Sequence, residues 1–208
     1  WGSTGARMEL AYRAEQVDIR RLFLEMDDFG QSTLRSGHLS GELTSDGMAI
    51  IQWAANGEIQ QDAIRWQGTQ TFIHGRLEGV EALMSIPSYL QDHRMSAPLV
   101  NPTDLGNKLQ SIALQPITTP VLFIRNTFHI PLIELQSDNL HVTLEGTQNL
   151  MGEIDYSVGI EMRDLRSAYN DDIGEVEDDG LGNNLFIQVL GTVEEVEYKW
   201  DRDAQRRH

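Results

Sequence analysis

The sequence contains no cysteine among its 208 residues, so it has no disulfide bond, no thiolate nucleophile and no cysteine-based zinc site. It also has no run of 18 or more apolar residues, which excludes a membrane-spanning helix within this sequence. Basic residues are scarce: 16 Lys and Arg stand against 32 Asp and Glu, and the formal net charge is −16. Nucleic acids and anionic membranes attract proteins mainly through Lys and Arg, so this charge argues against both as direct partners.

The recurrent motifs of enzymes and metal sites are missing as well. There is no Gly-x-Ser-x-Gly, no phosphate-binding loop and no His-Glu-x-x-His. Gly180-Leu181-Gly182 begins like a dinucleotide-binding motif, but it lacks the third Gly and leads into a predicted strand. The acidic residues from Asp171 to Asp179 match no helix-loop-helix calcium site, and we interpret them as a solvated loop. We therefore predict a protein that is not an enzyme, with no catalytic residue, no metal and no cofactor.

The remaining composition is that of an ordinary globular protein. Hydrophobic residues make up 40% and charged residues 23% of the chain, which is long enough to bury a sizeable core. We expect a single domain over residues 1–208, with one sub-boundary to consider near 91–104, where Pro98 and Pro102 fall. The chain opens at Trp1 with no initiator Met, and we expect this domain to be a fragment of a longer protein.

Helices are predicted where apolar residues recur every three or four positions. The clearest one follows Asp18, a suitable N-cap, and it ends before Gly30. Its apolar stripe consists of Ile19, Leu22, Phe23 and Met26. Shorter helices are predicted at residues 78–90, 105–112 and 163–169.

Strands are predicted over most of the other residues. Apolar and polar side chains alternate for nine residues from Ile154 to Met162, which indicates a strand with one apolar face. Ser45-Asp46-Gly47 has the composition of a turn, and it separates two of the predicted strands. The predicted strands are residues 8–14, 38–44, 48–54, one or two in 59–77, 121–124, 140–145, 154–162, 185–190 and 193–200, with 146–152 as a hairpin connection. The fold class is therefore α+β: a mainly antiparallel, curved β-sheet, shaped as a groove or an open roll, with a few packing helices.

The apolar stripes of these strands have two interpretations. They face an ordinary core, or one face of the sheet stays open and holds the acyl chains of a lipid. The candidate groove residues occupy alternate positions in three strands, and they are Leu140, Val142, Leu144, Ile154, Tyr156, Val158, Ile160, Leu185, Ile187 and Val189.

The chain also carries a series of short motifs in a fixed order. They are residues 17–23 with Phe29-Gly30-Gln31, residues 39–44, 125–131 and 137–147, Ile154-Asp155-Tyr156, residues 177–180, and Gly191-Thr192-Val193. From Met8 to Tyr198, their order and spacing resemble the C-terminal region of AsmA-like proteins, in the AsmA/TamB family. Two features depart from that pattern: residues 91–105 are richer in Pro, and the long charged tail of the family is cut short at His208.

This resemblance implies a protein anchored in the inner membrane of a Gram-negative bacterium, with its bulk in the periplasm. In related proteins a long curved sheet forms an apolar groove that bridges to the outer membrane and carries phospholipid. The implied function is a non-enzymatic scaffold for lipid transfer and outer-membrane maintenance, with phospholipid acyl chains as its ligand. The alternative is an assembly or docking module, in which helices cover the apolar face and a sheet edge pairs with an outer-membrane β-barrel protein.

Overall fold

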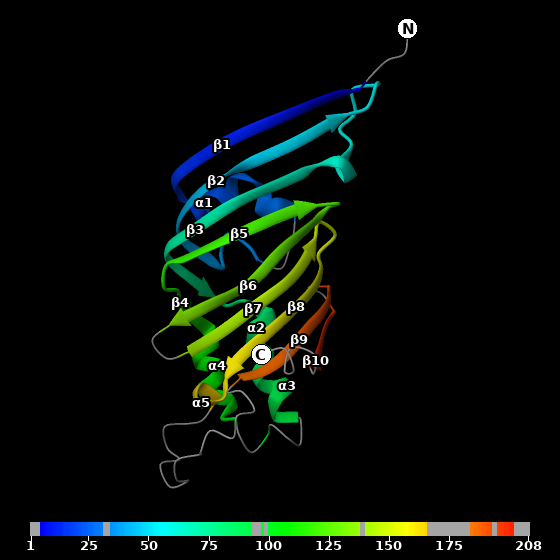
Figure 1. Ribbon diagram of the computed structural model, residues 1–208. Helices are drawn as coiled ribbons and strands as arrows, with labels where there is room; N and C mark the ends of the chain where they lie inside the picture. The colour runs from blue at the N-terminus through cyan, green and yellow to red at the C-terminus, as the bar shows by residue number, and fades with distance from the viewer. Residues whose placement is uncertain are drawn as a thin grey trace.

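The computed structural model describes residues 5–30, 34–92, 97, 100–137, 140–165, 184–192 and 195–201. Its main feature is one antiparallel sheet with the strand order β1-β2-β3-β5-β6-β7-β8-β9-β10, to which the short strand β4 is added beside β3 (Figure 1). The sheet is open, with β1 and β10 as its edges. The predicted α+β class, with a curved and mainly antiparallel sheet, is confirmed.

The sheet has two halves that differ in what covers them. The N-terminal half consists of β1 (Ala6–Asp18), β2 (Leu39–Trp53), β3 (Arg65–Glu78), β4 (Ser111–Ala113) and β5 (Ile117–Ile124). The C-terminal half consists of β6 (Thr127–Ser137), β7 (Leu140–Asn149), β8 (Glu153–Glu161), β9 (Asn184–Thr192) and β10 (Val196–Trp200).

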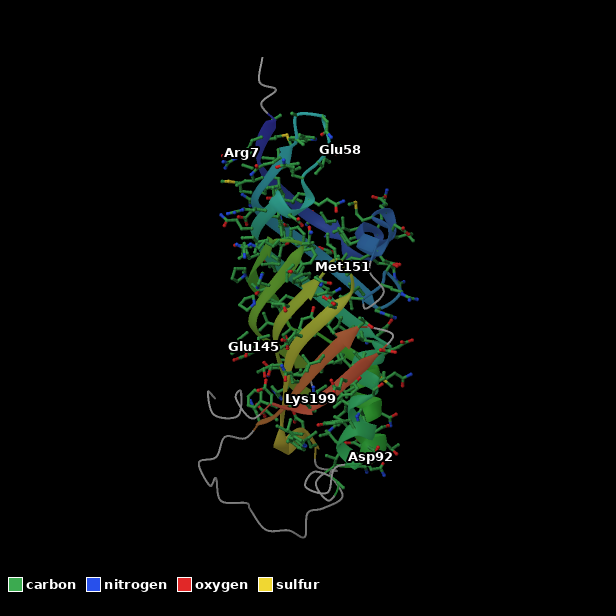
Figure 2. The ribbon with its side chains drawn as sticks, turned by 90° about the vertical axis from the view of Figure 1, so that its right-hand side faces the viewer. Arg7, Glu58, Asp92, Glu145, Met151 and Lys199 are labelled. Atoms are coloured by element: carbon green, nitrogen blue, oxygen red, sulfur yellow. The ribbon has the colours of Figure 1, made fainter. Side chains whose placement is uncertain are left out.

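The helices are short and are placed mainly on one side of the sheet. They are α1 (Ile19–Glu25), α2 (Glu81–Met84), α3 (Ile86–Asp92), α4 (Pro102–Gln110) and α5 (Met162–Leu165), with the 3₁₀ segments Asp27–Gly30 and Gln61–Ala63. Helices α1 to α4 lie on the same side, whereas Glu145 projects from the opposite side (Figure 2). We call the side with the helices the apolar face and the other side the polar face.

The core lies between helices α2 to α5 and the C-terminal half of the sheet. Helices α3 and α4 contribute Ile86, Leu90, Leu105 and Leu109, each at most 2% exposed. The alternation predicted for β8 is confirmed in part: Ile154, Val158 and Ile160 are buried and Asp155 is exposed. Tyr156 and Ser157 are both half-buried, and Gly159 is buried. Leu90 and Leu105, on either side of residues 91–104, belong to the same core cluster.

Helix α1 begins where the sequence predicts. The Asp18 carboxylate accepts a hydrogen bond from the backbone N–H of Arg21, which satisfies one of the free donors of the first turn. Ile19 is 4% exposed and anchors the helix on the sheet. Phe23 packs edge-on against Phe29, with ring centroids 5.1 Å apart.

The prediction of a turn at Ser45-Asp46-Gly47 is wrong, because β2 passes through these residues without interruption. Gly47 lies opposite Tyr12 of β1 and Gly68 of β3. A Cβ atom at Gly47 would lie 2.4 Å from the carbonyl oxygen of Gln67, so the backbones approach too closely for a side chain. The glycine therefore serves close packing between strands and not a reversal of the chain.

Two connections are also shorter than predicted. Strand β7 continues to Asn149, so the hairpin connection is residues 150–152 instead of 146–152. Helix α4 begins at Pro102, inside the predicted loop, because the Asn101 side chain accepts hydrogen bonds from the N–H groups of Thr103 and Asp104.

Candidate functional site

The ten residues predicted to line a lipid groove all lie on the apolar face, where the helices cover it. Eight of them are at most 8% exposed. Leu144 and Tyr156 are half-buried and pack against the same cluster. Helices α3 and α4, which precede these strands in the chain, fill the space above them. These ten positions are therefore part of a closed core in this structure and not the lining of an open groove.

The apolar face continues beyond this core into the N-terminal half of the sheet. Residues directly opposite each other in a ladder share a face of the sheet. Ile154 lies opposite Gln148, and Gln148 lies opposite Phe128. The same registers then lead from Phe128 through Phe123, Trp66 and Ala49 to Leu10 of β1. One face thus runs from the buried core to the edge strand.

In the N-terminal half, Ser45, Gln70, Thr119 and Phe123 are still buried on this face, and it becomes exposed only towards the β1 edge. Met8 and Leu10 of β1 are 40% and 48% exposed, whereas Leu140 and Ile160 on the same face are fully buried. Met8 lies opposite the half-buried Ile51. We call the part of this face nearest β1 the open apolar face. It comprises the exposed Met8 and Leu10 and the half-buried Ile51, Trp53, Trp66 and Phe128.

The polar atoms of two aromatic residues on this face, Tyr12 of β1 and Trp66 of β3, form hydrogen bonds within the protein. The Trp66 indole N–H donates to the Tyr12 hydroxyl at 2.7 Å, and this hydroxyl lies 2.8 Å from Ser45 Oγ. Phe128 packs edge-on against Trp66, with centroids 6.4 Å apart, and lies 4.6 Å from the Phe123 ring. With the indole and phenol groups paired to each other, mainly apolar ring surface remains for contact with a ligand.

Strand β1 forms a long free edge beside the open apolar face. It contains 13 residues and no Pro, and it pairs only with β2 in the part of the chain that the structure describes. The polar face of this strand carries alternating charges, with ion pairs between Arg7 and Glu9 and between Arg13 and Glu15. Charged side chains are typical of an edge that resists unspecific pairing with other sheets.

The polar face is hollowed into a broad trough of about 1180 Å³ that spans β2 to β9. Its lining includes the carboxylates of Asp46, Glu145 and Asp155 and the imidazole of His129. These carboxylates repel anionic headgroups. The trough also exposes apolar surface, because Met48 and Leu122 are 40% and 39% exposed. Its acidic lining makes it the less suitable of the two faces for an anionic phospholipid.

The open apolar face was not among the predicted site residues. A signal for it was present, because Met8, Leu10 and Tyr12 alternate with Arg7, Glu9 and Arg13. The alternation is broken by small residues in β1 and by the turn-like composition of β2, so its extent was not apparent.

Two other expectations concern metals and membranes. The acidic stretch at 171–179 lies outside the described residues. Among the residues that the structure does describe, His141, Glu161 and Asp164 place possible metal ligands close together. No helix in the described ranges is both long and apolar enough to cross a membrane.

Comparisons of the chain with protein-family models, with curated proteins and with solved structures found no match, so the resemblance to AsmA-like proteins rests on the sequence motifs alone.

Proposed function

We propose that this protein is a non-enzymatic scaffold that holds the acyl chains of phospholipids against its open apolar face. The proposal rests on one observation: helices cover one end of a continuous sheet face and leave the other end exposed. Helices close it completely over Leu140 and Ile160, whereas Met8 and Leu10 remain 40% and 48% exposed. An apolar region left exposed on a protein with a net charge of −16 is the mark of a binding surface.

The chemistry of an acyl chain suits this surface. Its transfer from water to an apolar surface contributes roughly 25 cal/mol for each Å² buried and needs no directional bonds. The polar atoms of Tyr12 and Trp66 are already paired, so they compete little for such a ligand. The strong negative charge disfavours adsorption to a whole anionic bilayer, which supports the holding of individual lipids by their chains.

The AsmA-like motifs supply the cellular setting of the proposal. We place the protein in the periplasm of a Gram-negative bacterium, in lipid transfer and outer-membrane maintenance. The inner-membrane anchor would belong to another part of the full-length protein. The exposed face at the β1 end supports this role, because a lipid could enter and leave without opening the core.

The test is phospholipid that co-purifies with the protein, measured by mass spectrometry for the wild type, Leu10→Glu and Ala11→Glu. Leu10 lies on the open apolar face, and Ala11 is the next residue, exposed on the polar face. The two variants add the same charge to the same strand. We expect lipid with the wild type and Ala11→Glu and its loss with Leu10→Glu, while all three proteins stay folded in thermal melts. Lipid absent from the wild type, or retained equally by all three proteins, contradicts the proposal.

A second candidate function is docking by strand addition at β1. It is favoured by the free outer edge of that strand over 13 residues. The proposed partner is an outer-membrane β-barrel protein. Amide hydrogen exchange in the presence of outer-membrane vesicles tests it: protection of β1, with β10 unchanged, supports docking. Unchanged exchange in β1 contradicts it.

A further inference from the structure

Three side chains that can bind a metal meet where β7 and β8 reach α5. His141 belongs to β7, Glu161 to β8 and Asp164 to α5. One ligand atom from each lies within 4.8 Å of the other two. All three residues are half-buried, at the margin of the core into which the neighbouring Leu165 packs.

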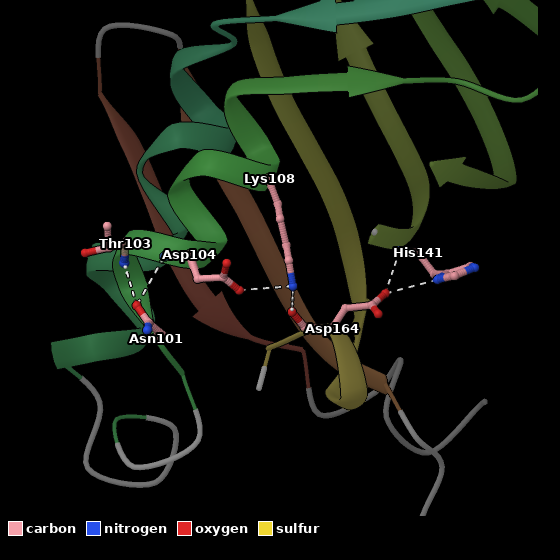
Figure 3. A network of polar contacts seen from close by, with 6 residues as sticks. All are labelled: Asn101, Thr103, Asp104, Lys108, His141 and Asp164. Atoms are coloured by element: carbon pink, nitrogen blue, oxygen red, sulfur yellow. Dashed lines mark hydrogen bonds and ion pairs between the residues drawn. The ribbon is translucent and has the colours of Figure 1, made fainter. Parts of the chain in front are cut away.

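Asp164 is held firmly in this group. Its Oδ2 atom accepts a hydrogen bond from the backbone N–H of His141 at 2.7 Å, and it lies 3.1 Å from His141 Nδ1 (Figure 3). The Lys108 ammonium lies nearby, but it donates to the backbone carbonyl of Asp164 at 2.8 Å and pairs with Asp104 at 3.1 Å (Figure 3). The Asp164 carboxylate is thus directed to His141, while Lys108 binds the main chain.

We propose that His141, Glu161 and Asp164 form a binding site for a divalent metal ion, with Zn²⁺ as the best match. One imidazole and two carboxylates form the mixed nitrogen and oxygen set that Zn²⁺ accepts, whereas Ca²⁺ and Mg²⁺ prefer oxygen alone. A neutral imidazole with two carboxylates also balances the charge of the ion.

The distances in the group are close to those that the ion requires. Zn²⁺ bonds of about 2.0–2.1 Å in a tetrahedron place neighbouring ligand atoms roughly 3.3 Å apart. The His141 Nδ1 and Asp164 Oδ2 atoms are already 3.1 Å apart. An oxygen of the Glu161 carboxylate lies within 4.8 Å of a ligand atom of each of these two residues, so binding of the ion requires this carboxylate to move closer. Three protein ligands leave the fourth position for water.

The other nitrogen of the His141 ring has a suitable partner. Gln136, which lies opposite His141 in the β6–β7 ladder, places its Nε2 atom 2.9 Å from His141 Nε2. When Nδ1 binds a metal, Nε2 carries the proton and must donate a hydrogen bond. A half-turn of the Gln136 amide presents Oε1 as the acceptor. Histidines that bind metals are generally oriented by such an acceptor on their second nitrogen.

A metal at this position joins two strands to a helix. It connects β7 and β8 to α5 beside the core, so it stabilises the folded chain by binding it in preference to the unfolded one. The proposal is independent of the lipid-binding function, because the open apolar face lies at the other end of the sheet.

The test is Zn²⁺ titration calorimetry on untagged protein, with Glu161→Gln, Asp164→Asn and the control His129→Gln. His129 lies in the trough of the polar face, away from the three ligands. The amide variants keep the size of each side chain, and their metal-free melting curves check the fold. We expect binding of one Zn²⁺ with all three ligands present, and a loss of affinity of about 100-fold or more in each amide variant. His129→Gln should bind like the wild type.

Gln136 separates a metal site from a merely structural hydrogen-bond network. We expect Gln136→Glu to retain or strengthen Zn²⁺ binding, and Gln136→Leu to weaken it about 10-fold. No binding by the wild type, binding that survives both amide variants, or equal affinity of the two Gln136 variants overturns the proposal.

Discussion

Val142 and Ile160 lie opposite each other in the β7–β8 ladder, and both are buried beneath the helices at 3% and 0% exposure. Leu10, on the same face of the sheet at the β1 edge, is 48% exposed. One face of one sheet therefore provides both a closed core and an open surface, and the same substitution at each end distinguishes them.

Val142→Glu should lower the free energy of unfolding by about 3 kcal/mol or more, because the carboxylate is buried without a partner. Leu10→Glu should cost about 1 kcal/mol or less, since its carboxylate stays hydrated. Urea denaturation of both variants provides the measurement. Losses of similar size at the two positions would contradict the difference in cover.

Gly146 carries a second prediction about packing. Its φ is +149°, and a Cβ atom there would lie 2.1 Å from the Asp155 carbonyl oxygen. Gly146→Ala should therefore cost about 2 kcal/mol or more from strain and overlap together. Gly57, with φ +86° and open space around it, is the matched control. Gly57→Ala should cost only about 1 kcal/mol, and equal melting temperatures for the two variants would count against this explanation.

Because Tyr156 is buried, we expect the free energy of unfolding to fall at alkaline pH. Burial raises its pKa to about 12, and its hydroxyl donates to Gln148 Oε1 at 3.0 Å. Below pH 10 the phenol is protonated in both folded and unfolded chains. Between about pH 10 and 12 the unfolded chain ionises first, so stability falls as the pH rises through this range. The contribution of this one group is about 1.4 kcal/mol for each pH unit.

Tyr156→Phe should make this alkaline fall less steep, although the lost hydrogen bond costs about 1 kcal/mol at neutral pH. Part of the fall should remain, because burial also raises the pKa of Tyr89 and Tyr198. Chemical denaturation at pH 8 to 11 measures both effects. An unchanged slope would show that Tyr156 ionises as readily in the folded chain.

The N-cap of α1 gives a local prediction. Asp18→Ala removes the acceptor for the Arg21 N–H and should cost about 1 kcal/mol. Asp18→Asn keeps an acceptor oxygen and should cost less. Denaturant melts of the two variants compare them, and a larger loss in Asp18→Asn would argue against capping.

Much of the sheet could be predicted from the sequence, because strict alternation specifies both a strand and its apolar side. Residues 154–162 show this, since nine residues with a period of two leave little choice of register. Asp18 likewise specified the start of α1, as capping depends only on neighbouring residues.

Which part of the sheet the helices bury could not be predicted in the same way. Val142 and Leu10 both read as apolar residues of a strand, and only the distant residues of α3 and α4 decide which one is buried. The cluster of His141 and Asp164 depends on the same long-range placement, because β7 and α5 are separated by β8 along the chain. The composition of Ser45-Asp46-Gly47 led to the wrong prediction of a turn, because Gly is required both in turns and where two strands pack closely, as at Gly47.

The central claim is that lipid binds the open apolar face and not the covered core. It is tested most directly by a photoreactive amino acid placed at position 10, 11 or 142 in cells, followed by detection of phospholipid adducts. We expect strong crosslinking from position 10, which lies on the open face, and little from position 11, one residue away on the polar face. Position 142 should give none, because helices cover it. Equal crosslinking from positions 10 and 11, or adducts from position 142 alone, would contradict the account.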